Sequence, residues 1–136
     1  MTTEEIKTKI EASLSKLYIK DKILIDNKTN ERAICAHLLC YLKNEFLQWD
    51  VDTDYNREQG DVKRNIDRNI IVPDIIIHRR DSRENLVAIE AKGYWNDESR
   101  ENDYVKLHGL LFKQKYKYAF MIEFEAQSWE INEVIL

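Results

Sequence analysis

Two acidic residues and a lysine, set in two consecutive apolar segments, are the residues of this chain best suited to chemistry. Asp74 follows Pro73 and precedes the apolar run 75–77, while Glu90 and Lys92 lie within the apolar run 86–92. Residues 80–84, between the two runs, are polar and have the composition of a turn. Because side chains alternate between the two faces of a strand, Glu90 and Lys92 are expected to share one face.

The spacing of the two runs predicts a hairpin that brings these side chains together. If the turn is centred on Ser82, Asp74 lies directly opposite Glu90, and Val72 lies opposite Lys92. Directly opposed residues have Cβ atoms about 4.5–5.5 Å apart. Two carboxylates and an ammonium group would then converge on one patch, which is suited to a divalent metal ion that assists phosphodiester hydrolysis.

A purely structural interpretation of the same residues is also open. Asp74 would start a strand after a proline, and Glu90 and Lys92 would form an exposed pair on one face. Burying charged groups within a strand rich in Val, Ile and Ala costs free energy, and such groups usually occur there for a reason. We therefore favour the functional interpretation.

The rest of the chain predicts the elements that position this hairpin. A helix is expected over residues 2–17, where Thr2 and Glu5 fit a capping box, and a second helix over 31–43. The later elements are expected to be a strand (49–56), a polar loop (57–65), the hairpin strands (70–78 and 86–92), a helix (97–114) and a strand (116–124). Residues 129–136 fit either a strand or a helix.

These elements follow the order helix, helix, strand, strand, strand, helix, strand. The long helix between the strand of Glu90 and the strand over 116–124 makes those two strands parallel neighbours. We therefore expect an α/β fold with a mixed β-sheet of four or five strands flanked by helices. With 136 residues, the chain is expected to form a single domain, residues 1–136.

Composition excludes several classes of protein. The chain is 43% apolar and 34% charged, begins without the pattern of a signal peptide, and has no apolar stretch long enough to span a bilayer. We expect a soluble, cytoplasmic protein without a membrane partner. Cys35 and Cys40 are five positions apart in a helical pattern, so reduced thiols are expected rather than metal ligands.

Residues 70–80, with Pro73-Asp74, and residues 85–92, with Glu90-Ala91-Lys92, resemble the core of the PD-(D/E)xK nuclease superfamily. More closely, they are similar to small stand-alone bacterial and phage members of uncharacterised role. Such members often carry a Tyr-Asn-Arg at the end of the first strand, as at 55–57, and an Asp-x-x-Lys-Leu in the next helix, as at 103–107. The resemblance covers about residues 31–124, and it implies the restriction-endonuclease-like fold.

The resemblance also implies a Mg²⁺-dependent nuclease, with DNA favoured over RNA as its substrate and with Mn²⁺ able to replace Mg²⁺. Asp74, Glu90 and the backbone carbonyl of Ala91 would hold the metal ion. Lys92 would position the attacking water or stabilise the negative charge that builds on the phosphate. The family also places an acidic residue on the helix before the first strand; Glu31 matches it and would bind the metal through water or hold a second ion.

Glu31 has two interpretations from the residues alone. At about 100° per residue, it falls near the centre of the apolar stripe of its helix, which favours an inward carboxylate in need of a partner. Alternatively, Glu31 lies in the first turn, favours the helix dipole and remains in water.

Arg79, Arg80 and Lys106 are candidate contacts to a nucleic-acid backbone. Basic residues crowd the region of the hairpin and would neutralise phosphates locally. Acidic residues are interspersed among them, so a solvated surface is the alternative interpretation.

The alternative to a nuclease is a non-catalytic module that retains the fold and binds nucleic acid or protein. The net charge is −4, and residues 119–136 contain four Glu and no Lys or Arg, which fits a domain without its own clamp on DNA. A homodimer would supply additional binding surface under either hypothesis, because two-fold assembly is the commonest oligomer. Dependence on metal discriminates between the two.

Overall fold

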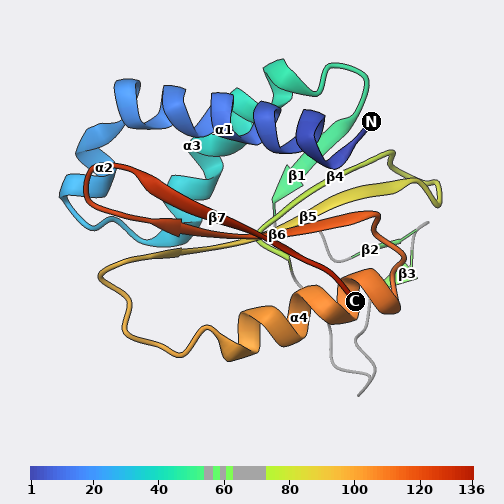
Figure 1. Ribbon diagram of the computed structural model, residues 1–136. Helices are drawn as coiled ribbons and strands as arrows, with labels where there is room; N and C mark the ends of the chain where they lie inside the picture. The colour runs from blue at the N-terminus through green and yellow to red at the C-terminus, as the bar shows by residue number, and fades with distance from the viewer. Residues whose placement is uncertain (54–56, 59–60, 63–72) are drawn as a thin grey trace.

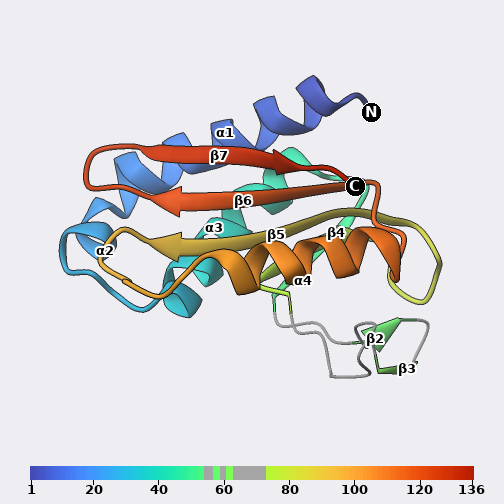
Figure 2. The ribbon, with the colours of Figure 1, turned by 60° about the horizontal axis from the view of Figure 1, so that its bottom comes forward.

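A computed structural model describes residues 1–53, 57–58, 61–62 and 73–136, and residues 54–56, 59–60 and 63–72 lie outside this description. The helices are α1 (Thr3–Lys20), α2 (Lys22–Asp26), α3 (Glu31–Glu45) and α4 (Glu101–Phe112). The strands are β1 (Asp50–Thr53), β2 (Arg57–Glu58), β3 (Asp61–Val62), β4 (Ile75–His78), β5 (Asn85–Gly93), β6 (Tyr118–Phe124) and β7 (Trp129–Val134). The arrangement has three layers, with α1 and α3 on one face of the main sheet and α4 on the other (Figures 1 and 2).

The main sheet has five strands in the order β1-β4-β5-β6-β7. Strands β5 and β6 run parallel and are joined through α4, whereas the other neighbouring pairs are antiparallel. Strands β2 and β3 form a separate two-stranded sheet. The expected α/β class, the mixed sheet and the parallel pairing across the helix are therefore confirmed.

The hairpin of β4 and β5 has the register that centring on Ser82 predicts. Ile75 pairs with Ile89, Ile76 with Ala88 and Ile77 with Val87, before a bulge shifts the pairing at His78. The same register, continued by one residue, sets Asp74 against Glu90. The predicted pairing of Val72 with Lys92 falls outside the described residues, because Val72 is not among them.

Other elements differ from expectation in length more than in type. The capping box of Thr2 and Glu5 is present at the start of α1, and Asn30 caps α3. Helix α4 starts four residues later than expected, since a turn at residues 94–95 and an irregular segment up to residue 100 follow β5. The undecided segment at the C-terminus is β7, and the expected loop over 57–65 contains the short strands β2 and β3.

The two faces of β5 enter two apolar clusters. Val87, Ile89 and Ala91 belong to the cluster that includes the buried residues of α1 and α3. Ala88 belongs to the cluster formed with Leu107 of α4. Because side chains alternate along a strand, Glu90 lies on the α4 side, with its carboxylate between sheet and helix. The site is therefore built between β5 and α4.

Within the described residues, no helix combines the length and apolar character that a membrane crossing requires.

The central position of β5 predicts a large effect of truncating its side chains. Ile89 is 0% exposed and pairs with Ile75 on one side and Phe120 on the other. We expect Ile89→Ala to lower the free energy of unfolding by about 2–5 kcal/mol, since it removes buried methyl groups and leaves a cavity. Chemical denaturation monitored by circular dichroism measures this loss.

The matched control is Ile19→Ala on α1, because Ile19 is 76% exposed. This control is expected to change the free energy of unfolding by about 0.5 kcal/mol or less. Similar losses in both variants would contradict the central place of β5.

Candidate active site

Asp74 and Glu90 form the centre of the candidate site. The backbone N–H of Asp74 donates to Glu90 Oε2 at 2.7 Å, and the backbone N–H of Ala91 donates to Asp74 Oδ2 at 2.8 Å. The two carboxylates are therefore held reciprocally across the start of β4 and the end of β5. Glu90 is fully buried, whereas Asp74 is partly exposed. The predicted convergence of these two residues is confirmed.

Helix α4 contributes two further charged side chains to this site. Lys106 Nζ lies 2.5 Å from Glu90 Oε1, and Lys92 Nζ lies 3.5 Å from Asp103 Oδ2. Asp103 and Lys106 are three positions apart, so they project from the same side of the helix. Asp103 was not among the site residues predicted from the sequence. It is, however, the first residue of the Asp-x-x-Lys-Leu motif at 103–107, which could have indicated it. Lys106 contacts Glu90 directly, and its predicted contact with nucleic acid stays untested.

The electrostatics of the site follow from burying two carboxylates side by side. Burial and the neighbouring charge of Asp74 raise the pKa of Glu90 to about 8, although Lys106 opposes this shift. Burial also raises the pKa of Asp74, against the hydrogen bond from Ala91 and the charge of Lys106. Burial opposes the charged form of Lys106, but the carboxylates of Glu90, Asp74 and Asp103 together outweigh it and raise the pKa of Lys106. The site therefore favours added positive charge.

The segment after β5 is held by one arginine. Arg100 donates to both carboxylate oxygens of Glu123, at 3.0 and 2.9 Å, and to the carbonyl oxygen of Gly93 at 3.2 Å. A Cβ at Gly93 would collide with the indole of Trp95, so that ring would have to shift to admit any other residue directly after Lys92. Arg100 thus fixes the end of β5 beside the site, a role that no pattern in the sequence indicates.

Glu31 lies at the start of α3 and accepts a hydrogen bond from the Asn96 side chain at 3.0 Å. No hydrogen bond or ion pair among the described residues joins Glu31 to Asp74 or Glu90. Glu31 therefore links α3 to the segment after β5, and its role as a metal ligand stays a prediction.

The structure does not bring Arg79 and Arg80 to the site. Both follow the far end of β4, whereas Asp74 precedes its beginning. Arg79 Nη1 lies 2.5 Å from Glu84, and its guanidinium stacks over the Trp49 ring. Arg80 donates to Asp52 at 2.6 Å. Local carboxylates already compensate both arginines, so their predicted contact with nucleic acid stays untested.

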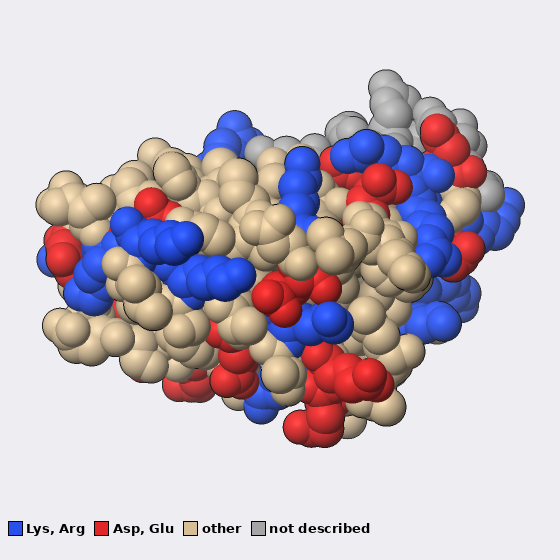
Figure 3. Space-filling view, turned by 90° about the horizontal axis from the view of Figure 1, so that it is seen from above, with Lys and Arg blue, Asp and Glu red and all other residues tan. Residues whose placement is uncertain are grey.

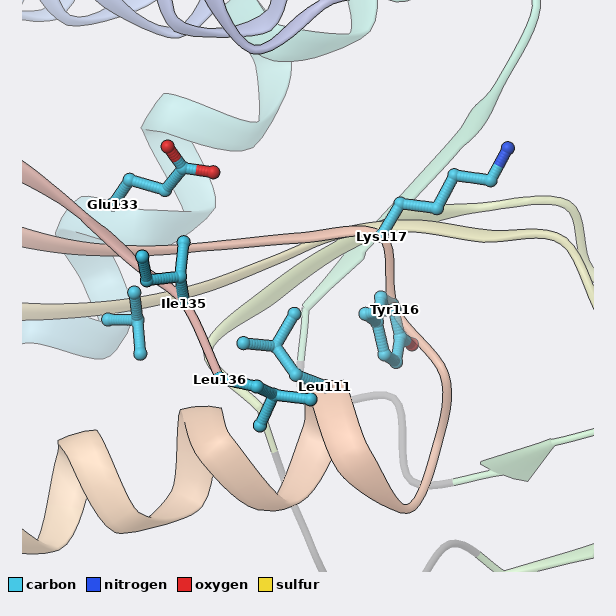
Figure 4. A pocket seen from close by; sticks show the side chains of 7 residues that line it. Leu111, Tyr116, Lys117, Glu133, Ile135 and Leu136 are labelled. Carbon is cyan, nitrogen blue, oxygen red and sulfur yellow. The ribbon is translucent and has the colours of Figure 1, made fainter.

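Two surface features lie apart from the site. On the face of the molecule that carries α1, Lys and Arg side chains are interspersed with Asp and Glu and with broad uncharged areas (Figure 3). A hollow between the end of α4 and the C-terminal residues is lined by Leu111, Tyr116, Lys117, Glu133, Val134, Ile135 and Leu136 (Figure 4). None of the residues that form the candidate site lines this hollow.

Asp74 and Glu90 offer carboxylate oxygens, which are the protein ligands that Mg²⁺ prefers. Among the described residues, no three Asp, Glu, His or Cys side chains gather in an arrangement that would hold a metal ion. Mg²⁺, however, is usually bound through one or two carboxylates and keeps several waters, which substrate phosphates can replace. The paired carboxylates of Asp74 and Glu90 fit such an open site, and they do not form a closed cage.

No protein-family profile, curated protein or solved structure matches this chain.

The raised pKa of Glu90 predicts a pH-dependent stability. In the unfolded chain the pKa is about 4.5, and in the folded protein it is about 8. Between these values the folded protein binds more protons, so the free energy of unfolding falls as pH rises, by up to about 1.4 kcal/mol per pH unit for one proton. In urea unfolding between pH 5 and 8 with EDTA present, Glu90→Gln should lose less stability than the wild-type protein.

Glu133→Gln is the control, because Glu133 is an exposed carboxylate on β7. It should follow the wild-type dependence on pH. Parallel curves for the wild-type protein and Glu90→Gln would contradict a raised pKa at Glu90.

Proposed function

We propose that this protein is a Mg²⁺-dependent nuclease that hydrolyses phosphodiester bonds of nucleic acid, with DNA favoured over RNA. The observation that carries the proposal is the reciprocal contact of Asp74 and Glu90 across β4 and β5. That contact brings together the acidic residues of the PD-(D/E)xK pattern, with Lys92 two positions further along the same strand. Paired carboxylates beside a lysine are the groups that metal-assisted phosphodiester hydrolysis needs.

The fold supports the same proposal at the level of architecture. A mixed sheet whose central hairpin carries the acidic residues, followed by a helix that leads to a parallel strand, has the element order expected for the restriction-endonuclease-like fold. We include that fold assignment in the proposal. Because one fold hosts many functions, the argument for function rests on the site.

Each residue has a distinct role in the proposed reaction. Asp74, Glu90 and the carbonyl of Ala91 would hold Mg²⁺, which when bound polarises the scissile phosphate and lowers the pKa of a coordinated water. Lys92 is 19% exposed on its side chain, so it is within reach of a phosphate at the surface of the site. Its ammonium would stabilise the negative charge that develops on the phosphate, while Asp103 holds it in place.

The protein is further proposed to act as a homodimer in the cytoplasm. A second copy of the chain would extend the surface that contacts the nucleic acid, because two-fold assembly is the commonest oligomer. We propose a cytoplasmic protein, with Mn²⁺ able to replace Mg²⁺.

Cleavage assays test this function. The purified protein is incubated with plasmid, linear duplex DNA, single-stranded DNA and RNA, in Mg²⁺, Mn²⁺ or EDTA. We expect cleavage that requires metal and falls at least about a hundredfold in Asp74→Asn, Glu90→Gln and Lys92→Met, because each variant removes charge from the reacting centre. Circular dichroism checks that the variants remain folded.

Lys113→Met is the matched control, since Lys113 is an exposed lysine at the end of α4 and should leave cleavage unchanged. Nucleic-acid binding that is equal in the wild-type protein and all three site variants, with no cleavage in any metal, would contradict the nuclease. That result would support the non-catalytic binding module instead.

A further inference from the structure

Strand β5 and helix α4 each contribute one acidic residue and one lysine to the site, and the four side chains pair crosswise. Glu90 of β5 contacts Lys106 of α4 at 2.5 Å, whereas Lys92 of β5 contacts Asp103 of α4 at 3.5 Å. The lysine of the Glu-x-Lys pattern therefore does not neutralise its own glutamate. Lys106 of helix α4 neutralises Glu90 instead.

The two oxygens of Glu90 are not equivalent in this arrangement. Oε2 accepts from the backbone N–H of Asp74, which is fixed at the entrance to β4. Oε1 faces the ammonium of Lys106, and the Glu90 side chain is 1% exposed. Oε1 is therefore the oxygen of Glu90 that no backbone hydrogen bond occupies, and a metal ion that binds there meets Lys106.

Lys106 is able to leave that position. Its side chain is 34% exposed, and a lysine ammonium on four flexible carbons can move into solvent without displacing the helix. If Lys106 stayed, its positive charge would repel a divalent ion at the same carboxylate oxygen.

We propose that Lys106 is an internal counter-cation that occupies the position of the metal at Glu90, so that Mg²⁺ binds by exchange with its ammonium. The inference rests on the proposed metal site and adds a competitor to it. While Glu90 is ionised, Lys106 neutralises its charge in the absence of metal, and the need to displace Lys106 weakens the affinity for Mg²⁺. The displaced ammonium moves into solvent on the side of α4, where a substrate phosphate would meet it.

Metal titration tests this exchange in the full-length protein. Isothermal titration calorimetry with Mg²⁺ and Mn²⁺ compares the wild-type protein with Lys106→Met, Lys106→Arg and Lys113→Met. We expect Lys106→Met to bind the metal at least about ten times more tightly than wild type, because the competing cation is gone. Lys106→Arg keeps the positive charge and Lys113→Met leaves the site intact, so both should bind like the wild-type protein.

A measurement on the wild-type protein decides the question if Lys106→Met does not fold. The side-chain ammonium signal of Lys106 is followed by ¹⁵N nuclear magnetic resonance during Mg²⁺ titration, with Lys106→Arg used for its assignment. We expect the signal to move towards that of a solvated lysine, while the signal of Lys113 stays constant.

The outcomes separate this inference from the proposed function. Metal binding of equal or lower affinity in Lys106→Met, or a Lys106 signal that does not change as metal binds, overturns the exchange and leaves the metal site standing. No binding of Mg²⁺ or Mn²⁺ by the wild-type protein or any variant overturns both the exchange and the proposed metal dependence.

Discussion

The register of β4 against β5 brings two carboxylates together at the end of a buried hairpin, and the rest of the site responds to that constraint. Asp74 and Glu90 each accept a backbone hydrogen bond from the opposite arm of the hairpin, so neither can turn away without losing that bond. Burying two such groups side by side costs free energy unless cations or protons compensate them. The raised pKa values of both residues express this cost.

Helix α4 supplies the positive charge that compensates Glu90 and that the hairpin itself does not place there. Its apolar residues, including Leu107 and Leu110, pack on the sheet beside Ala88. That packing brings Lys106 to Glu90 and Asp103 to Lys92. The packing of α4 on the sheet thus couples the stability of that layer to the charge balance of the site. The same arrangement leaves Lys92 partly exposed and held by an acid, which suits a group that must meet a phosphate.

The parts of this account that depend on local patterns could be predicted, and those that depend on packing could not. Alternation and turn residues were sufficient to predict the register that sets Asp74 against Glu90. The pairing of Lys106 with Glu90 joins residues sixteen positions apart through the docking of a helix, and Arg100 acts through contacts that carry no periodicity. Strands β2 and β3 have two residues each, too short for alternation to be seen.

The central claim is that the adjoining carboxylates of Asp74 and Glu90 hold a divalent ion. Crystals grown with Mn²⁺, measured at a wavelength where manganese scatters anomalously, test it most directly. We predict an anomalous peak in contact with Asp74 and Glu90, and no such peak in crystals of Asp74→Asn. Well-ordered crystals at high Mn²⁺ concentration with no peak at these carboxylates, or with a peak only at surface acids, would contradict the claim.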